Sequence, residues 1–118
     1  MTTKQKATKT KDIKDIKNLK GLKEVQEHYL DYPYPMRNPE DDKTRLLKVY
    51  GDYLGEINHW LFDGKKDFTK KFRVLIAGGG TGDSTVYLAE QLKDTNAEVI
   101  YLDFSKNSMA IAQKRAEY

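Results

Sequence analysis

A short apolar run that leads directly into a glycine-rich turn constrains this sequence more than any other feature. Residues 72–77 read Phe-Arg-Val-Leu-Ile-Ala, a pattern typical of a strand that is buried on both faces. The turn at 78–82, Gly-Gly-Gly-Thr-Gly, follows at once, and Asp83 or Ser84 comes next. Either residue can cap a helix. The sequence therefore predicts a strand, a tight turn and a helix in direct succession.

A second strand and a second helix follow. Residues 97–102 predict a strand that ends at Asp103, and Ser105 can cap a helix that continues through Met109, Ala112 and Ala116. Connections this short permit only a right-handed parallel crossover, so the fold class is α/β. The inner face of the first helix is expected to carry Thr85, Leu88, Ala89 and Leu92.

The glycine turn and the residue at the end of the second strand suggest a ligand. Glycines allow positive φ angles and let a ligand approach the backbone closely, and a helix start presents unpaired N–H groups. Asp103 lies 21 residues after Gly82. A carboxylate at that strand tip can accept hydrogen bonds from both hydroxyls of a ribose. The combination predicts an adenosine-type cofactor.

The glycine spacing departs from the dinucleotide fingerprint Gly-x-Gly-x-x-Gly. Counted from Gly78, the third glycine would fall at Asp83, and counted from Gly80 it would fall at Thr85. Asp83 would also place a negative charge beside a pyrophosphate, which is unfavourable. A ligand without phosphates, such as S-adenosylmethionine, avoids this conflict.

The two strand–turn units resemble class I S-adenosylmethionine-dependent methyltransferases. Residues 74–83 are similar to the first motif of that family, and residues 101–105 followed by 109–112 are similar to its second motif. The resemblance covers residues 72–118. The segments 32–35 and 57–62 resemble the helical N-terminal extension of a bacterial subgroup of these enzymes.

The resemblance implies a cofactor, S-adenosyl-L-methionine, and a set of residues that bind it. The glycines would pass under its methionine part, Asp103 would hold the ribose, and Phe104 would lie beside the adenine. The full implied set is Gly78, Gly79, Gly80, Thr81, Gly82, Asp103 and Phe104. Ile76 is a departure, because many members carry an acidic residue there.

The implied fold is Rossmann-like, with a seven-stranded sheet, of which residues 72–118 supply the beginning. We therefore expect these residues to be the N-terminal part of a truncated methyltransferase domain. The two apolar strands would then lack part of the cover and the edge partners that parallel strands need.

Two segments precede this domain. Residues 1–20 carry seven Lys and two Asp and are predicted to be a disordered basic tail. Residues 21–71 are predicted to form a helical extension, with a short helix over 22–30 and one long helix from the cap Asn38 through Leu61. Between them, the sequence Tyr-Pro-Tyr-Pro at 32–35 should be extended. It either clamps the N-terminal helix onto the domain or lines and covers a ligand cleft.

No catalytic residue can be assigned. His59 and His28 are candidates to lie near a substrate, although a lone His beside Trp60 on a helix is more often a packing residue. Arg37 is a candidate to contact an acidic substrate or the cofactor carboxylate. The chain has no Cys and two His, so we expect no thiolate chemistry and no metal.

The predicted function is methyl transfer from S-adenosylmethionine to an unidentified acceptor. The alternatives are a nucleotide-binding module without catalysis and an NAD-type oxidoreductase. The chain has no apolar run long enough to span a membrane and no secretory signal, so a cytoplasmic location is predicted. A nucleic-acid partner is not indicated, because the basic excess belongs to residues 1–20.

Overall fold

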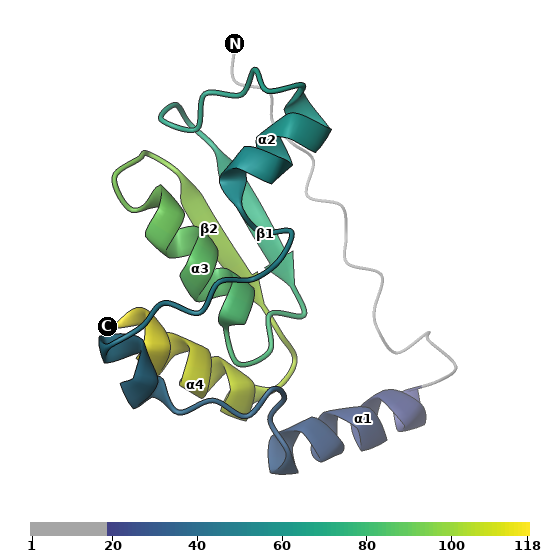
Figure 1. Cartoon of the computed structure of the whole chain (residues 1–118). Helices are drawn as coiled ribbons and strands as arrows, with labels where there is room; N and C mark the ends of the chain where they lie inside the picture. The colour runs from purple at the N-terminus through teal and green to yellow at the C-terminus, as the bar shows by residue number, and fades with distance from the viewer. Residues whose placement is uncertain (1–18) are drawn as a thin grey trace.

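The computed structural model describes residues 19–118, which form a small α/β unit preceded by helical segments (Figure 1). The predicted tail falls almost wholly on residues outside this range. Its last two residues begin α1, Leu19–Asp31, which confirms the short N-terminal helix and extends it. No helix within residues 19–118 is long and apolar enough to cross a membrane.

The central element is a parallel pair of strands. β1, Arg73–Ala77, pairs with β2, Glu98–Leu102, in a register that places Leu75 beside Ile100. α3, Asp83–Leu92, connects the two strands, and α4, Lys106–Ala116, follows β2. The order strand–helix–strand–helix and the parallel pairing confirm the predicted α/β class.

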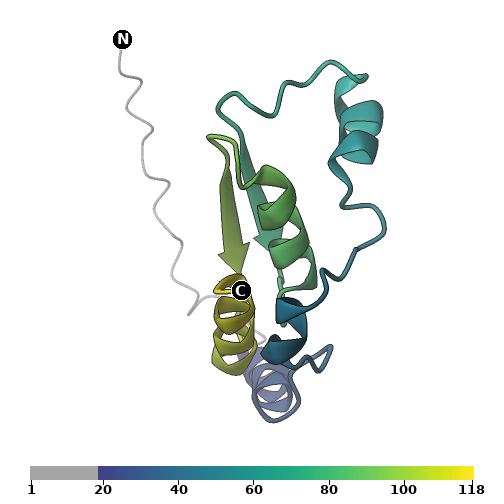
Figure 2. The same ribbon diagram turned by 60° about the vertical axis from the view of Figure 1, so that its left-hand side comes forward.

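One face of this sheet is covered and the other is open. Tyr101 lines a pocket together with Thr85 of α3 and residues of α4, so its face is the one that the helices cover. Leu75 and Leu102 point to the opposite face and are 58% and 57% exposed. No helix of residues 19–118 covers that face in either view (Figure 2). Within residues 19–118, β1 is therefore not buried on both faces, and the two strands lack part of their cover, as expected.

The long helix predicted after Asn38 is also wrong. Asn38 does act as a cap, and its Oδ1 accepts a hydrogen bond from the Glu40 amide at 3.2 Å. The helix that it begins is only the short 3₁₀ helix η2, Pro39–Lys43, and the chain then runs without regular structure to α2, Leu54–Phe62. Gly51 adopts φ +88°, which no helix allows.

A side chain from α3 stabilises the non-helical stretch. The amide of Gln91 donates to the Asp52 carbonyl at 2.9 Å, and its oxygen accepts from the Leu54 amide at 2.9 Å. These bonds satisfy backbone groups that a continuous helix would have satisfied internally. Long-range contacts thus override a helical pattern that the local sequence favours.

The caps of the two later helices differ in how well they were predicted. Ser105 caps α4, and its hydroxyl accepts from the Ser108 amide at 3.2 Å, as expected. The cap of α3 is Gly82, with φ +100°, and neither Asp83 nor Ser84 fills that position. Asp83 instead begins the helix, and its side chain makes longer-range contacts.

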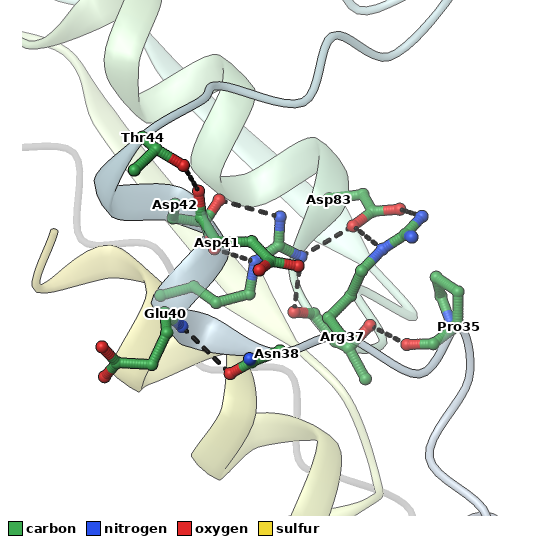
Figure 3. Close-up of polar contacts among 10 residues, drawn as sticks. Pro35, Arg37, Asn38, Glu40, Asp41, Asp42, Thr44 and Asp83 are labelled. Carbon is green, nitrogen blue, oxygen red and sulfur yellow. Dashed lines mark hydrogen bonds and ion pairs between the residues drawn. The ribbon is translucent and has the colours of Figure 1, made fainter.

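Those contacts form an ion-pair network around Arg115 (Figure 3). The Arg115 side chain is only 2% exposed. Its Nε donates to Asp42 Oδ2 at 2.7 Å, and its Nη1 donates to Asp83 Oδ1 at 2.7 Å and to the Thr81 carbonyl at 3.0 Å. One buried guanidinium therefore joins α4, η2, α3 and the glycine turn.

Removal of this guanidinium should destabilise the chain strongly. Arg115→Ala leaves the Asp42 and Asp83 carboxylates without their shared cation, and loss of one partner of a buried ion pair costs about 3 kcal/mol. Urea denaturation followed by circular dichroism measures the free energy of unfolding. Lys114→Ala, an exposed neighbour on the same helix, is the control and should change it by less than about 0.5 kcal/mol. Equal effects of the two variants would contradict the network's role.

Candidate functional site

The glycine turn is bonded directly to the end of β2. The amides of Gly78 and Gly79 both donate to the Leu102 carbonyl, at 2.8 and 3.0 Å. Gly78, Gly80 and Gly82 have φ angles of +69°, +54° and +100°. These angles lie in the left-handed region that glycine adopts without strain, which accounts for the alternating glycines of the sequence.

Asp103 lies at the tip of β2 and faces this turn. Its Oδ2 accepts from the Gly80 amide at 2.8 Å, and its Oδ1 accepts from the Ser105 amide at 2.8 Å. Each carboxylate oxygen has a second lone pair. Asp103 can therefore hold the turn and still accept hydrogen bonds from a ligand.

A pocket of about 230 Å³ opens at this end of the sheet. Four of the predicted cofactor-binding residues line it together: Gly78, Gly80, Asp103 and Phe104. Two further residues complete the lining, Tyr34 and Ser108. The predicted set is thus brought together in part, and the pocket also has a wall that comes from outside residues 72–118.

The other three predicted residues serve the protein interior. Thr81 is fully buried, and its hydroxyl donates to the Pro35 carbonyl. A Cβ at Gly82 would lie 2.9 Å from the Cβ of Ala112, so Gly82 permits the close approach of α4. A Cβ at Gly79 would overlap the Tyr101 ring at 2.5 Å. None of the three lines the pocket.

Tyr101 supports the turn from behind. Its hydroxyl donates to the Gly80 carbonyl at 2.7 Å. Burial, together with the negative charge of Asp103, raises the pKa of Tyr101 to about 12. The phenol therefore stays protonated at neutral pH and remains a hydrogen-bond donor to the turn.

Residues 32–37, here called the strap, cross the glycine turn. The Tyr34 carbonyl would lie 2.9 Å from a Cβ at Gly80, and the Pro35 carbonyl accepts from the Thr81 hydroxyl. Arg37 donates through Nε and Nη2 to the two oxygens of Asp83, at 2.9 and 2.7 Å (Figure 3). The strap is therefore fixed to the turn and to α3, and its residue Tyr34 also lines the pocket.

Asp83 is paired with two arginines, and this pairing removes the expected repulsion between its carboxylate and a phosphate. Burial opposes its ionisation, but hydrogen bonds from Arg37 and Arg115 outweigh that effect and hold the pKa of Asp83 below its usual range. The carboxylate faces these two cations and does not line the pocket. Its negative charge is compensated, so it no longer argues against a pyrophosphate.

The candidate residues for contact with a substrate are not brought to the pocket. His59 lies on α2, exposed and edge-on to Trp60, near the end of the sheet opposite the turn (Figure 1). His28 is on α1, with its ring 5.4 Å from that of Tyr32. Arg37 is engaged with Asp83. None of the three lines the pocket.

Sequence reasoning missed Ser108 of the lining and the partners Asp42 and Arg115 of the network. Asp42 lies in a run of acidic residues, and Arg115 lies in a helix that was predicted from its Ser105 cap and its apolar residues. Asp42 and Arg115 lie 73 positions apart, so no local sequence pattern predicts their contact.

Comparisons with models of known families, with curated proteins and with solved structures find no significant match to this chain. The methyltransferase resemblance therefore stays a prediction that depends on the two motifs and the pocket.

Gly80 and Gly78 form a matched pair for testing the strap's position. Gly78→Ala adds strain at a positive φ, about 1 kcal/mol, and its Cβ meets nothing within 4 Å. Gly80→Ala adds similar strain and a clash with the Tyr34 carbonyl at 2.9 Å. We expect Gly80→Ala to unfold at lower urea and to shift the amide resonances of the strap. Gly78→Ala should leave the strap resonances in place, and matching spectra would contradict this geometry.

The contribution of Asp83 to stability should depend on pH. Because its folded pKa is lowered, its contribution is fully present above the unfolded value of about 3.9 and is lost as the pH falls through the folded value. Asp83→Asn should therefore be less stable than wild type at neutral pH, by about 2 kcal/mol, and the difference should vanish in acid. Urea titrations from pH 7 to pH 2.5 measure it, with the exposed Asp41→Asn as control. A pH-independent difference would contradict an ionised, paired Asp83.

Proposed function

We propose that this chain belongs to an S-adenosylmethionine-dependent methyltransferase and that the pocket at the carboxyl ends of β1 and β2 binds the cofactor. One observation carries the proposal. The carboxylate of Asp103 and the ring of Phe104 share one pocket with the glycine turn, at the edge where parallel α/β sheets bind their ligands. This arrangement suits a nucleoside whose ribose hydroxyls meet Asp103.

The hydrogen bonding of the turn supports a ligand without phosphates. A phosphate needs free backbone N–H groups or cationic side chains. The amides of Gly78, Gly79, Gly80 and Gly82 all donate within the protein. Among the described residues, those lining the pocket include one carboxylate and no Lys or Arg. The bonded glycine amides and a lining without Lys or Arg disfavour an NAD-type ligand, whatever the charge of Asp83.

The charge of the pocket also suits this cofactor. S-adenosylmethionine supplies a methyl group on a positively charged sulfonium. The Asp103 carboxylate is an electrostatic partner for a cation, and the lining also includes two aromatic residues, Tyr34 and Phe104, of a kind that attracts cations. In the proposed reaction these residues bind and orient the cofactor, and positioning for in-line displacement accounts for the catalysis. The acceptor of the methyl group is unidentified, and the cytoplasmic location stays a prediction.

The ribose contact can be tested from the ligand side. We expect adenosine to bind roughly tenfold more tightly than 2′,3′-dideoxyadenosine, because hydrogen bonds to a charged group contribute about 1.5 kcal/mol or more. In Asp103→Asn this preference should largely disappear. Chemical-shift titration of the isotopically labelled chain gives both dissociation constants. We expect millimolar values, because about 230 Å³ is below the roughly 300 Å³ of small ligand pockets.

Two controls make the result specific. Asp94→Asn changes an exposed carboxylate beyond α3 and should keep the preference for adenosine. Urea denaturation of Asp103→Asn separates lost binding from lost stability, because Asp103 also holds the Gly80 and Ser105 amides. S-adenosylmethionine should shift the turn resonances, and NAD should not. Equal affinity of wild type for the two nucleosides would contradict the ribose contact.

A further inference from the structure

We infer that the strap supplies a wall of the cofactor pocket through Tyr34, and that Arg37 is the positioning residue that holds this wall against the glycine turn. The inference rests on the proposed function, because it assigns Tyr34 to the same pocket. It goes beyond that function by giving a ligand contact to the N-terminal extension.

The side chain of Tyr34 is placed as a contact residue would be. Its backbone is fixed against the turn by the carbonyl over Gly80 and by the neighbouring Pro35–Thr81 hydrogen bond. Tyr34 also lines the pocket, and the residue is 72% exposed, so its ring is open to solvent at the pocket's edge. A tyrosine that served only to pack the strap would be buried. A fixed backbone that carries an exposed ring at a pocket is suited to contact a ligand.

The chemistry of the wall fits a nucleoside with a sulfonium group. Phe104 is 45% exposed and lines the same pocket, together with Asp103 between the strand tip and the turn. Aromatic faces attract both flat bases and cations. Tyr32, two residues earlier, is also exposed but does not line the pocket. Of the two tyrosines in the Tyr-Pro-Tyr-Pro motif, only Tyr34 therefore lines the pocket.

Arg37 fixes the position of the strap, and therefore of Tyr34, relative to α3. Its two hydrogen bonds to Asp83 are a bidentate, partly buried ion pair, and Asp83 is itself held by the buried Arg115. The strap is thereby registered against the first turn of α3. A lysine at 37 would keep the charge but could not form both bonds in one plane. Geometry, and not charge alone, should set the position of Tyr34.

The experiment measures ligand affinity and strap position in the same samples. The full chain is labelled at glycine, and the resonances of Gly78 and Gly80 are followed during titration with S-adenosylhomocysteine and with adenosine. The variants are Tyr34→Ala, Arg37→Ala and Arg37→Lys. Tyr32→Ala controls for removal of an exposed tyrosine, and Arg45→Ala controls for removal of an exposed arginine near the strap.

We expect Tyr34→Ala to weaken S-adenosylhomocysteine binding roughly fivefold, the scale of one aromatic contact, without a change in the urea midpoint. Arg37→Ala should weaken binding by a similar factor and should shift the Gly80 resonance before any ligand is added. Arg37→Lys should fall between wild type and Arg37→Ala. Tyr32→Ala and Arg45→Ala should bind as wild type does.

The outcomes separate this inference from the proposed function. Adenosine binding that depends on Asp103 but is unchanged in Tyr34→Ala overturns the wall and leaves the cofactor proposal standing. An Arg37→Ala variant that is less stable but keeps its affinity and its Gly80 resonance makes Arg37 a structural residue only, and overturns its positioning role. A wild-type chain that binds neither ligand overturns the cofactor proposal and this inference with it.

Discussion

The buried guanidinium of Arg115 is the constraint on which the rest of the structure depends. The hydrophobic core is small, because the buried apolar residues among those described are only Tyr87, Leu88, Leu92 and Ala112. The two-stranded sheet adds little to it, since one of its faces is open. A buried arginine is stable only when its hydrogen bonds are satisfied. Asp42, Asp83 and the Thr81 carbonyl satisfy it, and this requirement brings η2, α3, the turn and α4 to one point.

The same network removes an objection to phosphate ligands at the pocket. Asp83 was expected to repel a phosphate, but its charge is shared between Arg37 and Arg115. The proposed preference for a ligand without phosphates therefore depends on the turn, whose four glycine amides donate within the protein. Arg37 extends the network to the strap, because its hydrogen bonds to Asp83 fix the strap to α3. We infer that this contact places Tyr34 at the pocket. A polar clamp thus positions residues that a small apolar core could not.

The sequence predicted the parts of this architecture that depend on neighbouring residues. The strands, the turn, the Ser105 cap and the position of Asp103 at a strand tip all follow from local patterns. The long helix after Asn38 failed because Gln91 and Arg115, distant in the chain, bind that stretch in another conformation. His59 does not line the pocket, because α2 lies near the opposite end of the sheet. The role of Tyr34 stayed open, since only tertiary contacts decide between a clamp and a wall.

The glycines of the turn have reasons of their own, apart from any ligand. Gly79 accommodates Tyr101, Gly82 accommodates Ala112, and Gly80 accommodates the Tyr34 carbonyl. A glycine pattern here would persist even if no cofactor bound, so the pattern alone is weak evidence for one. The same holds for Asp103, whose two backbone hydrogen bonds give the fold a use for that carboxylate. Loss of binding in an Asp103 variant therefore has two explanations. Only removal of the ribose hydroxyls from the ligand, with the protein unchanged, isolates the contact on which the proposed function depends.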